Sequence, residues 1–154
     1  PGFTKYDGAK DGRVRTGAHS LAWWADWGPV GEEGGVYQTV YVTPGLPYRF
    51  SAWVNGDDGI NDGGQSISSQ IGIDPTGGTD PNAVTVVWTA PAWYGGAQRL
   101  NNVWYQDEVV AVSQGDRLTV FLRMHLQRSM IHHMYWTTRR WRPRRRRVPR
   151  RPAG

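Results

Sequence analysis

Residues 35–54 read GVYQTVYVTPGLPYRFSAWV, and this stretch decides the fold class. Two runs of about seven residues alternate apolar and polar side chains, which is the period of a half-buried β-strand. The residues between them, Thr43-Pro44-Gly45-Leu46, predict a type II turn, because proline presets φ at the second position and glycine tolerates positive φ at the third. We therefore expect a tight antiparallel pair in an all-β protein, with a sheet face or rim loops carrying the function.

The composition indicates one domain with many turns. The chain has 154 residues, 20 glycines, 10 prolines, nine tryptophans and no cysteine. The lack of cysteine excludes disulfides and thiol chemistry. No apolar run approaches the roughly 20 residues of a membrane span. The chain starts at Pro1 without a visible signal peptide, so we expect a processed product or a piece of a longer protein.

The net charge of +5 conceals two different parts of the chain. Nine of the 18 basic residues lie in Arg139–Arg151, whereas residues 1–138 hold the other nine together with all 13 acids. The body is thus mildly acidic, and the charge does not indicate a basic binding face. We expect a β-sandwich module over residues 1–136 and a disordered Arg/Pro-rich tail over residues 137–154. An alternative origin of the tail is a one-base shift in reading frame.

Eight segments have strand periodicity or strand composition, and clusters of Gly, Pro, Asn and Asp separate them. We expect residues 1–17 to be irregular and residues 90–102 to form a long loop. Short strands at this spacing predict an antiparallel jelly-roll β-sandwich. The predicted strands are 20–24, 36–42, 48–55, 66–74, 84–88, 104–112, 117–124 and 135–136.

The order of several motifs resembles a group of bacterial extracellular β-sandwich modules of the galactose-binding-like, carbohydrate-binding type. The most specific motifs are YRFSAWV at 48–54 and GIDPTGG at 72–78, and the resemblance covers about Arg13 to Trp136. Such modules are accessory domains of large secreted or surface proteins. The resemblance implies a jelly roll, glycan binding without catalysis, and an extracellular or cell-surface location.

Both ends of the chain depart from the pattern of that group. Its modules usually open with a strand carrying an Asn-Pro/Gly-x-Phe-Glu-like segment, and we expect this opening strand to be missing here. They usually close with Tyr-Trp-Asp-Asp and an apolar strand, whereas Tyr135-Trp136 precedes Thr137-Thr138 and an arginine run. A structural calcium is common in the group but involves these segments, so we expect no cofactor, with calcium as the alternative.

The first predicted site follows from strand alternation. If strands 48–54, 66–73 and 117–124 share a sheet, their apolar side chains form the core on one face. The other face then carries an aromatic ring, an amide and guanidinium groups: Trp53, Gln70, Arg49 and Arg123.

This combination suits a sugar, because pyranose rings pack their C–H faces on aromatic rings and their hydroxyls accept hydrogen bonds from Arg and Gln. We predict that Trp53 stacks on the sugar and that Arg49, Gln70 and Arg123 donate hydrogen bonds to it. The alternative is that Trp53 and Phe121 fill the second half of a two-sided core.

A second predicted site uses loop aromatics. Trp93 and Tyr94 precede two glycines in a loop, where binding residues are often presented. Trp23, Trp24 and Trp27 belong to the same group of candidates. The alternative for all five is packing against one end of the sandwich. Two further tryptophans lie in predicted strands and are expected in the core: Trp88 and Trp104.

The acidic residues and histidines do not form a recognisable metal motif. Asp57, Asp58, Asn61 and Asp62 lie in a glycine-rich loop but do not fit the register of a calcium-binding loop. We expect Asp74 and Asp80 to make Asx turns. The adjacent His132 and His133 should point to opposite faces of a strand, so with His125 they favour exposed polar positions over a metal site.

Nothing in the sequence indicates catalysis. No nucleophile-elbow motif is present. The pairs Glu32-Glu33 and Asp107-Glu108 are sequence neighbours and do not indicate the opposed carboxylates of a glycosidase.

We therefore predict a non-catalytic carbohydrate-binding module of a secreted or surface bacterial protein, with a polysaccharide or cell-surface glycan as its partner. One alternative is a structural or adhesion spacer without a small ligand. Another is polyanion binding, including nucleic acid, through the arginine tail.

Overall fold

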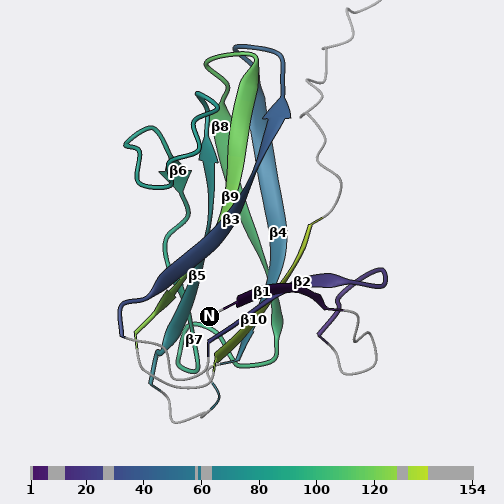
Figure 1. Ribbon diagram of the computed structural model, residues 1–154, viewed down its shortest axis with the longest axis vertical. Helices are drawn as coiled ribbons and strands as arrows, with labels where there is room; N and C mark the ends of the chain where they lie inside the picture. Colours follow the sequence, from purple (N-terminus) through teal and green to yellow (C-terminus); the bar gives the residue numbers. More distant parts are fainter. Residues whose placement is uncertain are drawn as a thin grey trace, which may run out of the picture.

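The structure is a computed structural model, and it describes residues 2–6, 13–25, 30–57, 59, 64–127 and 132–138 (Figure 1). Within these residues the regular structure consists of ten β-strands in two antiparallel sheets. The apolar side chains of both sheets meet in one core. The all-β sandwich predicted from the alternating sequence is therefore confirmed.

The first sheet has the strand order β1-β2-β10-β4-β8. Its strands are β1 (Gly2–Tyr6), β2 (Ser20–Ala25), β10 (His132–Thr138), β4 (Pro47–Asp57) and β8 (Trp104–Val112). In Figure 1, β1 and β2 lie crosswise near the lower end of the molecule, whereas β4 runs along its length.

The second sheet has the order β3-β9-β5-β6, and β7 also pairs with β5. Its strands are β3 (Glu33–Tyr41), β9 (Arg117–Leu126), β5 (Ile67–Asp74), β6 (Val87–Trp88) and β7 (Ala92–Tyr94). Figure 1 shows β3 crossing the front of the molecule, with β9 behind it.

The strand pairing is that of a jelly roll. When β1 and β7 are set aside, eight strands remain, and the first of them, β2, pairs with the last, β10. In the same nested way β3 pairs with β9, β4 with β8, and β5 with β6. This confirms the predicted jelly-roll topology.

The turn at 43–46 forms, but the hairpin predicted around it is wrong. Gly45 has a φ of +74°, as a type II turn requires. However, β3 pairs with β9 and β4 pairs with β8, so the two flanking strands belong to different sheets. Alternation indicates which face of a strand is apolar but not which strand lies beside it. Here the apolar faces of β3 and β4 meet across the core instead of lying side by side.

The chain crosses from one sheet to the other at residues 42–46, between β3 and β4, and again at residues 113–116, between β8 and β9. Hydrogen bonds join these two crossings. The buried Ser113 accepts a backbone hydrogen bond from Gly45 N at 2.9 Å and donates one to Leu46 O at 3.0 Å. Its hydroxyl donates to Thr43 O at 2.8 Å. The two crossings are therefore hydrogen-bonded to each other, and the backbone groups of the buried Ser113 have partners.

The two ends of the sandwich differ from the sequence prediction. The strand β1 lies at the edge of the first sheet, where we expected an irregular segment and no opening strand. An edge strand pairs on one side only, and its short sequence shows no alternation from which to predict it. The strand β10 extends to Thr138, two residues beyond the predicted boundary at 136, and β7 lies inside the predicted 90–102 loop. The predictions for the tail from residue 139 onward fall outside the described residues.

The core contains the side chains that alternation assigned to it on three strands. Phe50 is almost fully buried, as are the isoleucines of β5. Trp23, one of the aromatic residues considered for the second predicted site, is in the core, because it lies on β2 opposite Met134 of β10. The largest side chains with less than 2% exposure include Trp23, Trp136, Tyr94, Ile67, Ile71, Ile73, Leu118 and Met124.

The packing of Tyr94 on Gly56 gives a stability prediction. A Cβ atom at Gly56 would lie 2.7 Å from the Tyr94 ring, and that ring is fully buried. Gly56→Ala should therefore lower the free energy of unfolding by about 1–3 kcal/mol. Thermal or urea unfolding measures this loss. The matched control is Gly115→Ala, whose Cβ would meet nothing within 4 Å. Equal stability of the two variants would contradict the packing described.

Candidate functional site

The four residues of the first predicted site do not share a face. Trp53 and Arg49 lie on β4 and point outward from the first sheet, whereas Gln70 and Arg123 point outward from the second. Because the two sheets pack through their inner faces, the two pairs lie on opposite sides of the sandwich. The assumption that the 48–54 strand shares a sheet with the other two is wrong, for the same reason that the predicted hairpin is wrong.

On the first sheet, the polar and aromatic side chains are already engaged. Arg49 Nη1 donates to Glu108 Oε2 at 3.2 Å, and both side chains are exposed. The Arg15 guanidinium carbon lies 3.7 Å from the centre of the Trp53 ring. One face of the partly buried Trp53 is thus covered by a cation rather than open to a ligand.

The predicted loop aromatics separate into two kinds. Tyr94 is fully buried in the core, so it is not a surface residue. Trp93 points outward from β7 beside the second sheet, with its ring edge-on to His125 at a centroid distance of 5.9 Å. Trp24 is partly buried on β2, and Trp27 lies outside the described residues.

The outer face of the second sheet carries a row of aromatic rings that crosses its strands. Tyr37 on β3 pairs with Phe121 on β9, which pairs with Gly72 on β5, which pairs with Trp88 on β6. The ring centroids of Tyr37 and Phe121 are 6.0 Å apart, and those of Trp88 and Phe121 are 5.7 Å apart. Tyr37 is 58% exposed, whereas Phe121 is buried beneath its neighbours.

Gly72 determines how Trp88 lies. A Cβ atom at Gly72 would stand 2.7 Å from the indole, so the lack of a side chain lets the ring pack directly on the strand. Trp88 was expected in the core, and this expectation is wrong, because the residue points outward and is only partly buried. The glycine opposite it in GIDPTGG is the sequence signal that indicates such a close approach. Trp104, also expected in the core, is only partly buried on β8.

The next row along the strands is polar and contains Gly35, Arg123 and Gln70. Arg123 Nη2 donates to Gln70 Oε1 at 2.6 Å, and Gln70 Nε2 donates to Thr89 O at 2.8 Å. The Arg123 guanidinium carbon also lies 4.1 Å from the centre of the Trp88 ring. The structure therefore brings the predicted residues Gln70 and Arg123 together and adds Trp88 to them.

A third row contains Glu33, His125, Ser68 and Trp93 on four successive strands. His125 Nδ1 lies 3.3 Å from Glu33 Oε1. The Glu33 carboxylate, the His125 imidazole and the Trp93 indole thus lie beside the polar row on the same face of the second sheet.

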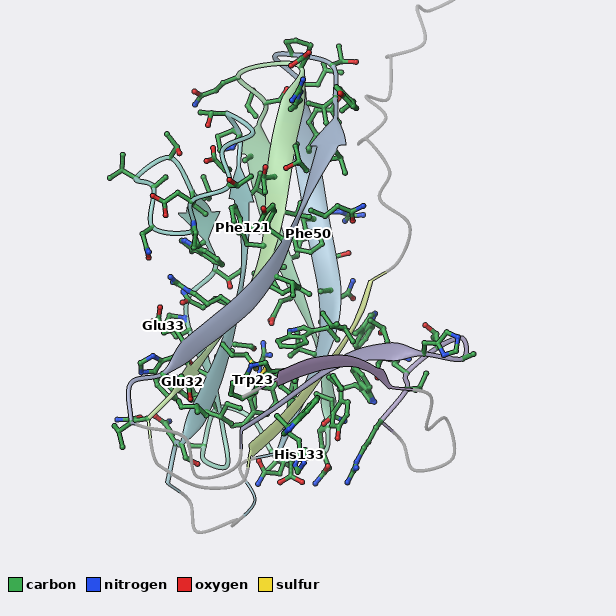
Figure 2. All side chains as sticks on the ribbon, viewed as in Figure 1. Trp23, Glu32, Glu33, Phe50, Phe121 and His133 are labelled. Atoms are coloured by element: carbon green, nitrogen blue, oxygen red, sulfur yellow. The ribbon has the colours of Figure 1, made fainter. Side chains whose placement is uncertain are left out.

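The aromatic row and parts of the other two rows line a groove of about 400 Å³, which we call the second-sheet groove. Its lining includes Glu33, Tyr37, Trp88, Phe121 and Arg123, together with Asn82 from the loop after β5. Figure 2 labels Glu33 near the start of β3 and Phe121 higher on the second sheet. Sequence analysis missed Tyr37 and Trp88; the position of Tyr37 between Val36 and Gln38 was the available signal for an outward aromatic side chain.

Asx turns hold the loop that borders the groove. Asp74 Oδ1 accepts a hydrogen bond from Thr76 N at 2.8 Å, and Asp80 Oδ1 accepts one from Asn82 N at 2.8 Å. Asp74 Oδ2 also accepts one from the Thr85 hydroxyl at 3.1 Å. The Asx turns predicted for Asp74 and Asp80 are therefore confirmed, and they position Asn82 at the groove.

In the described part of the chain, no three His, Asp or Glu side chains are grouped so that they could hold a metal ion. His125 lies on β9, and His133 stacks against Tyr135 at 6.4 Å on the other sheet. Asp58, Asn61 and Asp62 lie outside the described residues. The described residues also contain no helix that is long and apolar enough to cross a membrane.

Comparison with known proteins gives structural but not sequence matches. No family model and no curated protein sequence matches the chain. TmCBM61, solved in complex with β-1,4-galactotriose, has a TM-score of 0.53 at 12% identity, covering 89% of this chain and 82% of that one. The EclA C-terminal domain, described as a sugar-binding protein, has a TM-score of 0.51 at 14% identity, covering 82% of each chain.

A tailspike protein shares the fold as part of a much larger chain. The enzymatically active domain of tailspike protein 4 from bacteriophage CBA120 has a TM-score of 0.51 at 9% identity. The match covers 90% of this chain but only 18% of the tailspike chain. At these identities the likeness establishes the fold. The chain thus has the β-sandwich fold of carbohydrate-binding modules.

The buried Tyr94 belongs to a polar cluster between the sheets. Its hydroxyl donates to Val54 O at 3.2 Å and accepts a hydrogen bond from Arg99 Nη1 at 3.0 Å. Arg99 also forms a two-point ion pair with Asp107. Burial raises the pKa of Tyr94 from 10.0 to about 12, and the nearby Arg99 reduces this effect without cancelling it. The cluster is structural, because the hydroxyl is enclosed by the protein.

This pKa predicts a loss of stability in alkali. The phenol ionises near pH 10 in the unfolded chain but near pH 12 in the folded one, so its contribution is complete below pH 10 and falls as the pH rises towards 12. A shift of two units corresponds to roughly 3 kcal/mol. Urea unfolding from pH 9 to pH 12 measures the loss, which should be smaller in Tyr94→Phe. Parallel pH profiles of the two proteins would contradict the prediction.

Proposed function

We propose that this chain is a non-catalytic carbohydrate-binding module and that it binds glycan in the second-sheet groove. The observation that carries the proposal is the row of Tyr37, Phe121 and Trp88 beside the fixed pair Arg123 and Gln70. An apolar ring surface next to oriented hydrogen-bonding groups is what a pyranose requires, since it presents a C–H face and a rim of hydroxyls.

The volume and exposure of the groove support the same proposal. About 400 Å³ is within the range of small-molecule sites, and Tyr37 offers an exposed ring at the edge of this space. The sugar-binding proteins with the same fold support glycan as the ligand class. A spacer domain would not need a groove lined by aromatic rings. We further propose, from the sequence resemblance, that the module serves a secreted or cell-surface bacterial protein.

Two aromatic substitutions on opposite sheets test the proposal. A glycan array probed with the whole chain identifies a ligand, and calorimetry then compares Tyr37→Ala, Trp88→Ala and Trp53→Ala. Binding should weaken roughly 5–30-fold in Tyr37→Ala, which loses the exposed ring, and in Trp88→Ala, which loses the ring that supports Arg123, and it should be unchanged in Trp53→Ala. Thermal unfolding checks that each variant is folded, and Tyr37→Ala is the safest of them because its ring is exposed.

The outcomes separate the candidate functions. Loss of binding in Trp53→Ala alone would move the site to the first sheet. Absence of binding by the folded wild-type chain to every glycan on the array would reject the proposed function and favour the spacer. Binding that disappears only when residues 139–154 are deleted would instead indicate polyanion binding by the tail.

A further inference from the structure

Among the described residues Arg123 has no carboxylate partner, in contrast to Arg49, Arg99 and Arg117. Arg49 pairs with Glu108, Arg99 with Asp107, and Arg117 lies 4.0 Å from Asp116. Within the described residues, the contacts of Arg123 are the neutral Gln70 amide and the Trp88 ring. The guanidinium in the groove therefore carries a positive charge that is not directly paired with a carboxylate of the described residues.

The environment of this guanidinium makes an anion favourable. The residue is partly buried, and its Nε atom is buried without a hydrogen-bond partner. Removing a charge from water is costly unless an opposite charge or enough hydrogen bonds replace the solvent. Nη1 makes no hydrogen bond to a described residue, and the side chain lines the groove, so this nitrogen is available to a ligand.

The guanidinium is also held in a fixed position. Trp88 packs on one side of it, Gln70 holds Nη2 at 2.6 Å, and Thr89 holds Gln70 in turn. Arginine binds carboxylates through a planar set of donors, and a fixed set loses less conformational entropy on binding. The arrangement therefore favours a planar anion such as a carboxylate over a neutral hydroxyl.

The acidic groups near the groove lie away from this position or are engaged. Glu33 is two residues along the strand from the Arg123 row, about 7 Å away, and its carboxylate faces His125. Asp80 borders the groove on the loop and accepts the Asn82 backbone N–H. A ligand carboxylate at Arg123 would thus lie beside the aromatic row and apart from Glu33.

We propose that the second-sheet groove selects an acidic glycan, in which the carboxylate of a uronic acid pairs with Arg123 while a sugar ring packs on the exposed ring of Tyr37. This inference rests on the proposed function and specifies its ligand class. The carboxylate would supply the charge that the protein lacks at this point, and the aromatic row would supply the apolar surface.

The experiment compares acids with their neutral esters. Oligomers of galacturonate, glucuronate and mannuronate are each paired with their methyl esters and titrated into the whole chain by calorimetry. At least one acid should bind about tenfold more tightly than its ester. This preference should disappear in Arg123→Gln, persist in part in Arg123→Lys, and remain intact in the control Arg49→Gln on the first sheet.

Each result has one interpretation. Equal affinity for an acid and its ester, or binding of neutral glycans alone, would overturn the acidic ligand and leave the proposed function standing. An acid preference that persists in Arg123→Gln would also overturn it and would assign the charge effect elsewhere, such as the arginine tail. If the folded chain binds neither these oligomers nor any array glycan, the proposed function fails as well.

Discussion

Two crossings between the sheets hold this structure together. Residues 42–46 carry the chain from β3 to β4, and residues 113–116 carry it from β8 to β9. The buried Ser113 bonds to the first crossing through its N–H, its carbonyl and its hydroxyl, and Val42 N donates to Asp116 O at 2.8 Å. Because the two crossings are hydrogen-bonded to each other, the chain changes sheets with the backbone groups of the buried Ser113 satisfied. The opposed apolar faces of the two sheets follow from this arrangement.

The side chains on the outer face of each sheet are determined by which side chains point into the core. Once the apolar side chains of β3, β9 and β5 point inward, their alternate residues must point outward, and strand pairing arranges these in rows across the sheet. Gly72 then lets Trp88 lie against the strand, and Trp88 in turn supports the Arg123 guanidinium. The groove is thus a product of register: a slip of one residue in β9 would turn Phe121 and Arg123 into the core.

Local sequence patterns predicted the strand faces and the turns correctly but did not predict which strands share a sheet. The inward faces of the strands, the turn at Gly45 and the Asx turns at Asp74 and Asp80 agree with the sequence prediction. The grouping of Trp53 with Arg123 does not, because alternation distinguishes only two faces and cannot tell the outer face of one sheet from that of another. Gln70 and Arg123 stayed together because their strands are true neighbours.

The sequence alone determined the properties that depend on residues close together in the chain. These are the strand class, the apolar face of each strand and the turns that need glycine, proline or aspartate, since backbone sterics and side-chain alternation set them locally. Only the tertiary structure decided which strands share a sheet, that Tyr94 is enclosed beside Arg99, and that Trp88 meets Arg123 in a groove. These depend on contacts between distant residues, where competing pairings bury similar apolar surface and differ only in how well the whole core packs.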